Sequence, residues 1–399
     1  MAALLGLGDY WWGWGNLLFR WLHVLAAIAW IGSSFYFIAL DDHLSPPADE
    51  RDRARGVAGE AWEIHGGGFY RVEKFRVAPR ALPEPLYWFK WEAYTTWLSG
   101  FALLVVVFFV HPRASLVDPA VADLAGWEAV AVAAGGLAVA WIVYDGLCRL
   151  LARDERLLAL AVLGFAVLAS YGAGRLLSAR AAYVEVGAML GTMMAGNVLF
   201  VIIPAHRELV RAKQAGREPD PRWNVRGKQR SVHNNYLTLP VLFAMLSNHF
   251  PFTYGHDDAW VVLVCLMAVG AWTRHFFNLR HRGRNEWWIL ATAAAGVAGL
   301  AIWLRPHTSA AAAAGPAPTR AQVQAVVGRR CVPCHSLHPT QPGVASPPSG
   351  VVLDTWAKID LLAPLVKTVA VDNRLMPPSN ATHMTQDERD LLARWLAHR

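Results

Sequence analysis

The sequence predicts an all-α membrane protein: a polytopic eight-helix transmembrane bundle followed by a small, polar C-terminal domain. Three observations lead to this expectation. Of the 399 residues, 55% are hydrophobic and only 17% are charged, whereas soluble domains average about 25% charged residues. Long apolar stretches recur through the first 305 residues, and basic residues gather in alternate loops between them. This composition excludes an ordinary cytosolic enzyme and a disordered chain.

The apolar stretches define the predicted spans. A hydrocarbon core about 30 Å thick requires roughly 20 apolar residues per helix. The sixth stretch is the weakest, because it is short and contains Pro240. No secretory signal is expected before the first stretch, which lacks a basic region and a small-residue cleavage site ahead of it. The eight spans are 17–40, 94–111, 127–147, 157–177, 183–205, 236–250, 259–279 and 287–304.

Basic residues between the spans predict the orientation. The segments 41–93 and 206–235 each hold eight Lys and Arg, and the turns at 149–156 and 280–284 hold three each, while the intervening loops hold at most two. Short basic loops remain on the cytoplasmic side of a membrane. We therefore expect a multi-pass protein of the bacterial inner membrane with both termini periplasmic. The net charge of +7 then belongs to inner loops beside membrane lipid, and nucleic acid is not an expected partner.

Composition divides the chain into three parts. Residues 1–305 form the predicted eight-helix membrane domain, 306–318 an Ala/Pro linker, and 319–399 a polar domain. The polar domain should begin with a helix capped by Thr319 and Gln322 and end with one capped by Thr385 and Glu388.

Cys331-Val-Pro-Cys334-His335 has the spacing of a covalent c-type haem attachment site, in which two thioethers hold the porphyrin and the adjacent imidazole binds iron. A thioredoxin-like redox pair would need a βαβ setting, and a zinc site would need a second ligand pair. Neither is found in the sequence. The C-terminal domain is therefore predicted to be a small class I cytochrome c carrying one haem c, with His335 as an axial ligand.

The second axial ligand is expected to be a methionine. Met376 is preferred because two prolines follow it and stiffen its loop, whereas Met384 directly precedes a helix cap. His338 and His383 are alternatives. His/Met ligation raises the reduction potential and suits an electron acceptor.

Polar residues inside the spans are candidates for function. Arg274 and Asn278 share one helix face at i and i+4, with His275 beside them. His23 in the first span either bonds a neighbouring helix or contacts a ligand. Histidines fall into an outer tier, His23, His111 and His249, and an inner tier, His65, His206, His233 and His275. These tiers could hold a metal or haem, or could move protons.

Four long strings resemble the bacterial membrane-bound urate oxidases, also called urate hydroxylases. They are 62–70 (WEIHGGGFY), 88–97 (WFKWEAYTTW), 231–240 (SVHNNYLTLP) and 274–278 (RHFFN). In that family an eight-helix domain is fused to a cytochrome c, so the resemblance covers nearly the whole chain. It implies oxidation of urate to 5-hydroxyisourate with water as the oxygen source. Electrons would pass to the fused haem c and on to a respiratory cytochrome c or terminal oxidase.

The chemistry of urate, a flat monoanion, suggests which residues serve it. A guanidinium, amides and aromatic rings would match its charge, edges and faces. The candidates for binding are Arg274, Asn278, Asn234 and Asn235 with Trp62 and Phe69; for a general base, His65, Glu63 and His233; and for further contacts, His275 and His23.

This inner site raises a problem of distance from the outer haem. Either the oxidation takes place at the outer tier, with Arg20, His23, Asn248 and His249, or a second intramembrane haem or metal on His23, His249 or His275 bridges the gap.

Two other functions compete with urate oxidation. One is a non-catalytic subunit that passes electrons from a quinol or a partner dehydrogenase to the haem. The other is a haem- or copper-handling membrane protein, because the pattern from Leu22-His23 to Trp30-Ile31-Gly32 is similar to first helices of such families.

Overall fold

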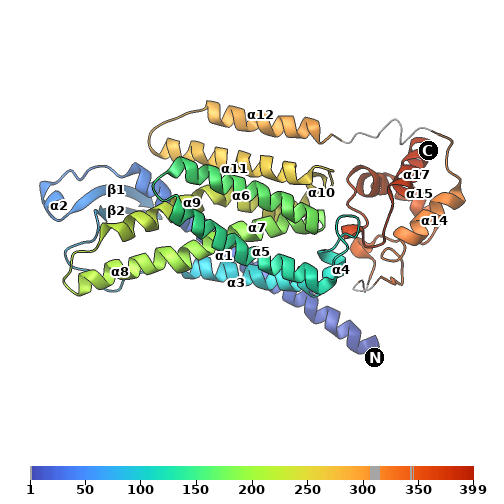
Figure 1. Cartoon of the computed structure of the whole chain (residues 1–399), viewed down its shortest axis with the longest axis horizontal. Helices are drawn as coiled ribbons and strands as arrows, with labels where there is room; N and C mark the ends of the chain where they lie inside the picture. The colour runs from blue at the N-terminus through green and yellow to red at the C-terminus, as the bar shows by residue number, and fades with distance from the viewer. Residues whose placement is uncertain (1, 306–314, 342–343, 345) are drawn as a thin grey trace.

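The computed structural model describes residues 2–305, 315–341, 344 and 346–399. Most of the expected linker, 306–314, lies outside the described residues. Long helices run side by side along the longest axis, a β-hairpin lies at one end, and the C-terminal domain lies at the other end (Figure 1). The N-terminal end of α1 points toward the same end as the C-terminal domain (Figure 1).

Six stretches of helix are long and apolar enough to cross a membrane: Trp11–His43, Trp91–Phe109, Gly126–Leu150, Glu155–Leu176, Ala179–Gln214 and Ala259–His281. They correspond to predicted spans one to five and seven. The elements concerned are α1 (Ala2–His43), α3 (Trp91–Leu104) with its π-helical extension η1 (Val105–Phe109), α5 (Gly126–Leu150), α6 (Glu155–Leu176), α7 (Ala179–Gly196) leading through η2 (Asn197–Ile202) into α8 (Ile203–Gln214), and α11 (Ala259–His281).

The other two predicted spans are helical but do not meet both criteria. α9 (Pro221–Leu246) begins at the cap Asp220, whose side chain accepts the Arg222 N–H, and its first half is polar. It continues through Pro240. α12 (Trp288–Trp303) has only 16 residues. The count of eight spans therefore remains a prediction.

The expectation of an all-α chain is wrong for residues 57–75. β1 (Val57–His65) and β2 (Gly68–Phe75) pair as an antiparallel hairpin. Its turn is Gly66–Gly67, with φ of +56° and +82°, the conformation that a tight two-residue hairpin turn requires and glycine adopts readily. These glycines reverse the chain between the two strands.

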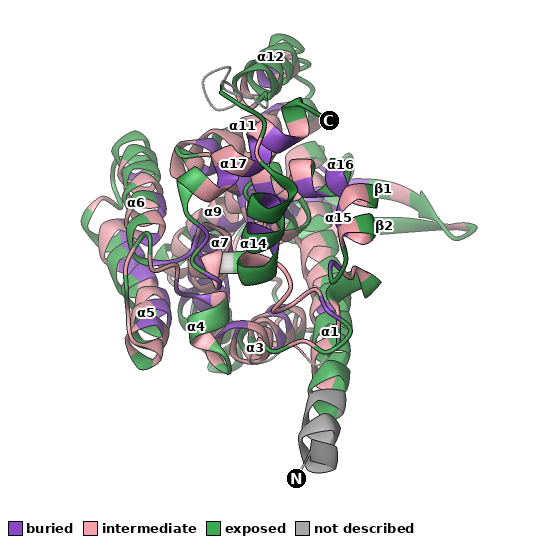
Figure 2. Ribbon diagram, turned by 90° about the vertical axis from the view of Figure 1, so that its right-hand side faces the viewer, coloured by how far each residue is buried: buried purple, intermediate pink, exposed green. Residues whose placement is uncertain are grey.

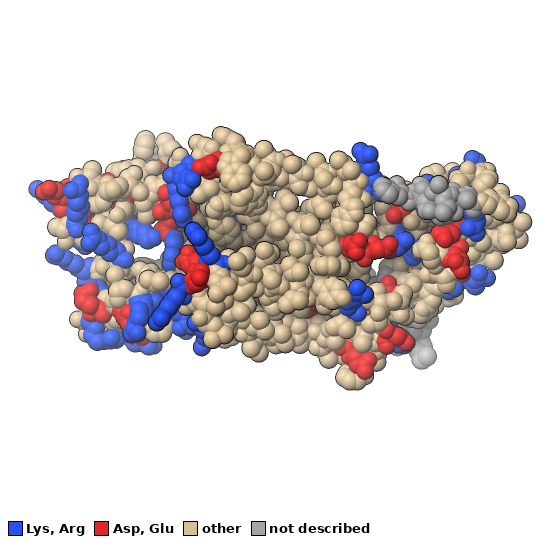
Figure 3. Space-filling model, turned by 45° about the horizontal axis from the view of Figure 1, so that its top comes forward, with Lys and Arg blue, Asp and Glu red and all other residues tan. Residues whose placement is uncertain are grey.

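Apolar exposure and charge follow the pattern of a membrane protein. Buried residues face the interior of the bundle, while α6 and α12 lie at its periphery (Figure 2). Many large apolar side chains are exposed on the helices, including Leu160, Leu168 and Ile302. Charged side chains crowd the two ends and are nearly absent from the middle of the face shown in Figure 3, with Lys and Arg dense at the end opposite the C-terminal domain. This is the distribution expected of side chains that face lipid between two aqueous ends.

Short elements cap the end of the bundle nearest the C-terminal domain: α4 (Pro112–Ser115), η3 (Ser247–His249) and α10 (Pro251–Tyr254). At the hairpin end, α2 (Glu50–Ala54) packs beside β1. Arg71 of β2 pairs there with the carboxylates of Asp52, Glu60 and Glu73.

The C-terminal domain is a small helical unit with its own apolar core, which includes Val323, Val327 and Leu392. Both predicted capping boxes are confirmed: Thr319 with Gln322 begins α14, and Thr385 with Glu388 begins α17. Its elements are α14 (Arg320–Arg330), η4 (Pro348–Gly350), α15 (Trp356–Leu361), α16 (Ala363–Val366), η5 (Lys367–Asp372), η6 (Pro378–Asn380) and α17 (Gln386–Ala397).

Candidate functional site

The polar half of α9 supplies the bundle with buried hydrogen-bonding groups that bond toward two different sides. Arg230 and Asn234 bond with α5 and the α7–η2 segment. Asn235, the next residue, bonds with α11. Two separate polar networks result.

The first network is centred on a paired buried arginine. Arg230, 1% exposed, donates from Nη2 to Asp145 Oδ1 at 2.6 Å and from Nη1 to Asn197 Oδ1 at 3.0 Å. Asp145 also accepts from Arg149 Nε at 2.6 Å. The charge of Arg230 is thus balanced by a carboxylate, as a buried ion usually requires.

His233 and Asn234, both predicted site residues, belong to this first network. The Asn197 amide donates to the Tyr144 hydroxyl and to Asn234 Oδ1, each at 2.8 Å. The Asn234 amide donates to the Met194 carbonyl at 3.0 Å. His233 Nδ1 lies 2.8 Å from the Tyr144 hydroxyl. The expected grouping of Asn234 with Arg274 is therefore corrected: its hydrogen bonds are made with the other network.

The second network brings three predicted residues together. Arg274 Nε donates to Asn235 Oδ1 at 2.5 Å, and Asn235 Nδ2 donates to Asn278 Oδ1 at 2.9 Å. The three side chains are 4%, 1% and 6% exposed, respectively. The Arg274 guanidinium also lies 3.7 Å from the ring centre of Phe35 on α1, a contribution that the sequence analysis missed. We call Arg274, Asn235, Asn278 and Phe35 the Arg274 cluster.

The guanidinium of Arg274 lacks the counter-ion that Arg230 has. Its Nη2 is buried and has no hydrogen-bond partner among the described residues. Within the same residues, no carboxylate forms an ion pair with it. The Asp42 carboxylate acts on it only through space and is itself paired with Arg282, and a buried charge without a directly bonded partner costs several kcal/mol. The Arg274 cluster is therefore suited to an anion that pairs with the guanidinium and whose edges can bond amides.

His275 follows Arg274 in the chain but takes part in different contacts. Its Nδ1 lies 2.7 Å from the Tyr236 hydroxyl. Its ring stacks on Trp272, with centres 5.5 Å apart. His275 is thus held in an aromatic group next to the Arg274 cluster.

His23 has the structural role that the sequence left open. Its Nδ1 lies 2.9 Å from the Thr96 carbonyl and 3.3 Å from Ser99 Oγ. Its ring lies against Gly100 of α3, where a Cβ would come within 2.8 Å of it. These contacts join α1 to α3. Within the described ranges there is no group of three or more His, Cys, Asp or Glu that could hold a metal ion.

The predicted residues of the 62–70 string lie on the hairpin. Trp62 and Phe69 are 66% and 77% exposed, His65 is exposed beside the turn, and the hairpin projects beyond the outline of the bundle (Figure 2). Glu63 accepts from the Tyr36 hydroxyl at 2.6 Å. The hairpin therefore separates Trp62, Phe69 and His65 from the Arg274 cluster, which corrects their expected grouping.

The outer polar residues considered as an alternative site are bonded locally. Arg20 donates to the Asn16 side chain from Nη2 at 3.0 Å. Asn248 accepts from Arg180 Nε at 2.8 Å. His249 is exposed.

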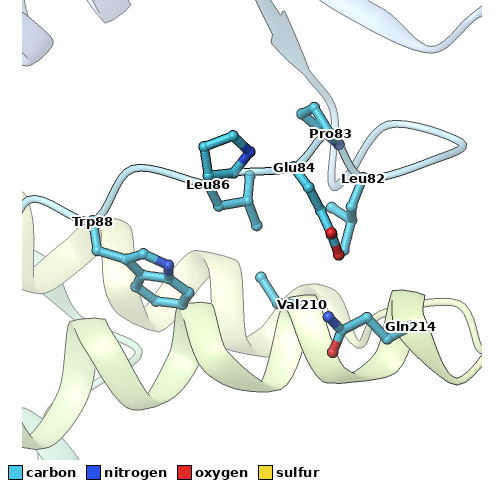
Figure 4. A pocket seen from close by; sticks show the side chains of 8 residues that line it. Leu82, Pro83, Glu84, Leu86, Trp88, Val210 and Gln214 are labelled. Carbon is cyan, nitrogen blue, oxygen red and sulfur yellow. The ribbon is translucent and has the colours of Figure 1, made fainter.

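A pocket of 570 Å³ lies between the loop before α3 and the helix α8. Its lining, shown in Figure 4, is largely apolar, with Glu84 as its charged residue and Gln214 as its amide. None of the predicted site residues lines it. A carboxylate without a cation is a poor setting for an anion, so this pocket does not compete with the Arg274 cluster for an anionic ligand.

In the C-terminal domain, the CxxCH residues form a turn after α14. Cys331 is the helix cap, and its carbonyl accepts the His335 N–H at 2.8 Å. His335 Nδ1 lies 3.1 Å from the Val351 carbonyl. A proton on Nδ1 would satisfy that carbonyl and leave Nε2 free as a ligand.

The surroundings of this turn fit a haem group. Cys331 and Met376 both border the apolar core of the domain, and Met384 lies within it, 4% exposed. Burial raises the pKa of the Cys331 thiol to about 12. The Met376 backbone is held by hydrogen bonds with Val369 and Arg389. Two thiols, an oriented imidazole and a fixed, half-buried thioether are the groups that covalent haem requires.

Comparison with known proteins identifies the helical domain. No curated protein and no solved structure matches the chain. The chain does match the urate oxidase N-terminal family over residues 9–305, which is most of its length and includes every element from α3 to α12. The chain therefore belongs to the urate oxidase N-terminal family.

Proposed function

We propose that this protein is a membrane-bound urate oxidase that passes electrons to a haem c in its own C-terminal domain. The observation that carries the proposal is the buried guanidinium of Arg274, which has no counter-ion among the described residues of a chain in the urate oxidase family. Urate is a planar monoanion and would supply the missing charge.

The Arg274 cluster has the groups that urate binding needs. The free Nη2 of Arg274 is a charged donor, and two such donors in one plane bond the edge of an anion in parallel. The amides of Asn235 and Asn278 supply neutral donors and acceptors. The ring of Phe35 stacks on the guanidinium of Arg274 and helps to hold it in position. We infer that these four side chains bind and orient urate.

The reaction assigned to this site is a hydration coupled to oxidation. Urate and one water give 5-hydroxyisourate, two protons and two electrons. When bound, haem supplies a one-electron acceptor. Cys331 and Cys334 would hold it through thioethers, and His335 and Met376 would provide nitrogen and sulfur ligands. Because such an acceptor takes one electron at a time, an external cytochrome c or terminal oxidase would have to accept the two electrons of each urate in turn.

The proposed orientation places the basic hairpin end in the cytoplasm and both termini in the periplasm, in accordance with the positive-inside rule. Arg274 and Ala259, at the periplasmic end of α11, are 15 residues apart, which is about 22 Å along a helix axis. Counting the haem groups and metal ions per chain tests how electrons would cross this length. A second centre would support oxidation at the Arg274 cluster, whereas a single haem c would contradict that assignment and favour oxidation near Arg20 and Asn248.

Anaerobic addition of urate to the purified protein, monitored by haem absorbance, tests the proposed function. Urate alone should reduce the haem, and an Arg274→Met variant should lose this response while an Arg282→Met variant, whose arginine pairs with Asp42 near the surface, should keep it. Reduction by a quinol but not by urate would show an electron-transfer subunit instead. Reduction by neither would show a haem- or copper-handling protein. Either result refutes the proposal.

A further inference from the structure

The C-terminal domain touches the helical domain through the segment that carries Met376. Arg374 Nη1 forms an ion pair with Asp257, in the loop between α10 and α11. Arg374 has a φ of +49°, a left-handed conformation that costs a non-glycine residue about 1–2 kcal/mol. The side chain that makes the contact thus stands on a strained backbone.

A glycine allows the two backbones to meet beside this ion pair. A Cβ on Gly255 would lie 2.0 Å from the Asn373 carbonyl oxygen. The φ of Gly255 is −80°, which any residue adopts, so only this close approach demands glycine there. On the other side of Arg374, Leu375 packs against the apolar core of the helical domain.

A second contact lies beside α4, where η6 meets the helical domain. Asp118 follows α4 and is half-buried; burial raises the pKa of its carboxyl, while the Ala120 N–H and the positive charges of Arg389 and His383 act in the opposite direction. Arg389 also donates to the Met376 carbonyl at 2.9 Å. Arg389 thus bonds to the Met376 loop and also attracts the Asp118 carboxylate of the helical domain.

We propose that the segment 373–376 is a docking element that holds the Met376 loop against the helical domain. Electrons from urate would enter the C-terminal domain through this contact. The inference rests on the proposed function for its electron donor. Each urate would give up two electrons and two protons, and haem, when bound, would accept these electrons one at a time through this contact.

The contact is suited to repeated release. Arg374 and Asp257 are 40% and 78% exposed, and exposed ion pairs are weak and screened by salt. The linker keeps the domain near its docking surface at a high effective concentration. Release between transfers then frees the same face for the external acceptor.

Charge reversal tests the ion pair. Asp257→Lys and Arg374→Asp should each slow urate-driven haem reduction in stopped-flow measurements by about three- to fivefold, and the double variant should restore the wild-type rate. Dithionite should reduce all three proteins at the wild-type rate. Unchanged rates in both single variants, or no recovery in the double variant, would overturn the proposal.

Steric exclusion and crosslinking test docking without urate. In the full chain, Asp257→Cys with Arg374→Cys should be joined by a short bismaleimide, and each single-cysteine variant reports any background from Cys148 and Cys265. Adding Gly255→Val should reduce the crosslinked fraction at least tenfold. The matched variant Gly172→Val, at a site with open space, should leave it unchanged.

The two tests separate the proposals. If the cysteine pair crosslinks but urate does not reduce the haem of the wild-type protein, the proposed function is refuted and docking stands. Haem reduction by urate at the wild-type rate in the Gly255→Val protein would refute electron passage through this contact.

Discussion

Replacing Arg274 by methionine should separate ligand binding from folding, because this buried arginine lacks the carboxylate that Arg230 has. The substitution leaves Asn235 Oδ1 without its donor, at a cost of about 1–3 kcal/mol. It also removes a buried charge whose desolvation costs several kcal/mol. The free energy of unfolding of the ligand-free protein should therefore stay within about 1 kcal/mol of wild type or rise.

The matched substitution, Arg230→Met, should behave in the opposite way. It removes the 2.6 Å partner of Asp145, and breaking a buried pair costs about 3–5 kcal/mol. We expect about 3 kcal/mol, the lower end, because Arg149 still pairs with Asp145. The affinity for urate should instead fall more in Arg274→Met than in Arg230→Met. Loss of one charge-assisted hydrogen bond, about 1.5–3 kcal/mol, should weaken binding to Arg274→Met about 10- to 150-fold.

Thermal unfolding in detergent, with and without urate, measures both effects. A ligand at 100 times its Kd stabilises the folded state by about 2.7 kcal/mol. With urate at that concentration, a 10- to 150-fold weaker affinity leaves Arg274→Met a gain of only about 0.3–1.4 kcal/mol, so urate should raise the Tm of wild type more than that of the variant. The reasoning is refuted if Arg274→Met unfolds as easily as Arg230→Met and still gains the full stabilisation from urate. Arg274 would then be a structural residue.

Three further predictions concern the C-terminal domain and the hairpin. Met376→Ala should leave haem attached but lower its reduction potential, whereas Met384→Ala should keep the potential and destabilise the domain by about 2–5 kcal/mol; potentiometry and thermal unfolding distinguish them. The hydrogen bonds from Arg330 hold the pKa of Glu388 below 4.5 despite partial burial, which acts to raise it. That stabilisation is present above pH 4.5 and is lost as the pH falls through the folded pKa, so Glu388→Gln should destabilise the domain by about 1–2 kcal/mol at pH 7 and have little effect at low pH. Gly67→Val, at φ +82°, should cost about 1–2 kcal/mol and speed hydrogen exchange in β1; unchanged exchange would contradict the turn assignment.

Much of the bundle was predictable because lipid imposes a simple rule on composition. Predicted spans one to five and seven coincide with apolar helices. A long apolar helix bonds its own backbone N–H and C=O groups and exposes side chains that suit lipid, so each crossing leaves a clear pattern in the sequence. α9 departs from that rule. Its polar first half bonds to neighbouring helices, so hydropathy marks only its last part.

The hairpin, and the division of the buried polar residues into two networks, were not predictable in the same way. The two short strands lie at a basic end of the bundle and do not stand out in a hydropathy profile. Only the paired glycines Gly66 and Gly67, which adopt positive φ readily, indicate the turn. Helical spacing correctly grouped Arg274 with Asn278. It gave no reason for Asn234 and Asn235 to bond toward different helices, because that depends on which neighbours pack against α9.

The opposite directions of Asn234 and Asn235 bear on how the Arg274 cluster would recognise the urate proposed to bind there. Asn234 is held by Asn197 and Met194, so α9 has little freedom to rotate, and the amide of Asn235 is kept in place before any ligand arrives. The conformational entropy of ordering that amide is lost during folding rather than during binding. The first network would thereby preorganise the second for the proposed ligand.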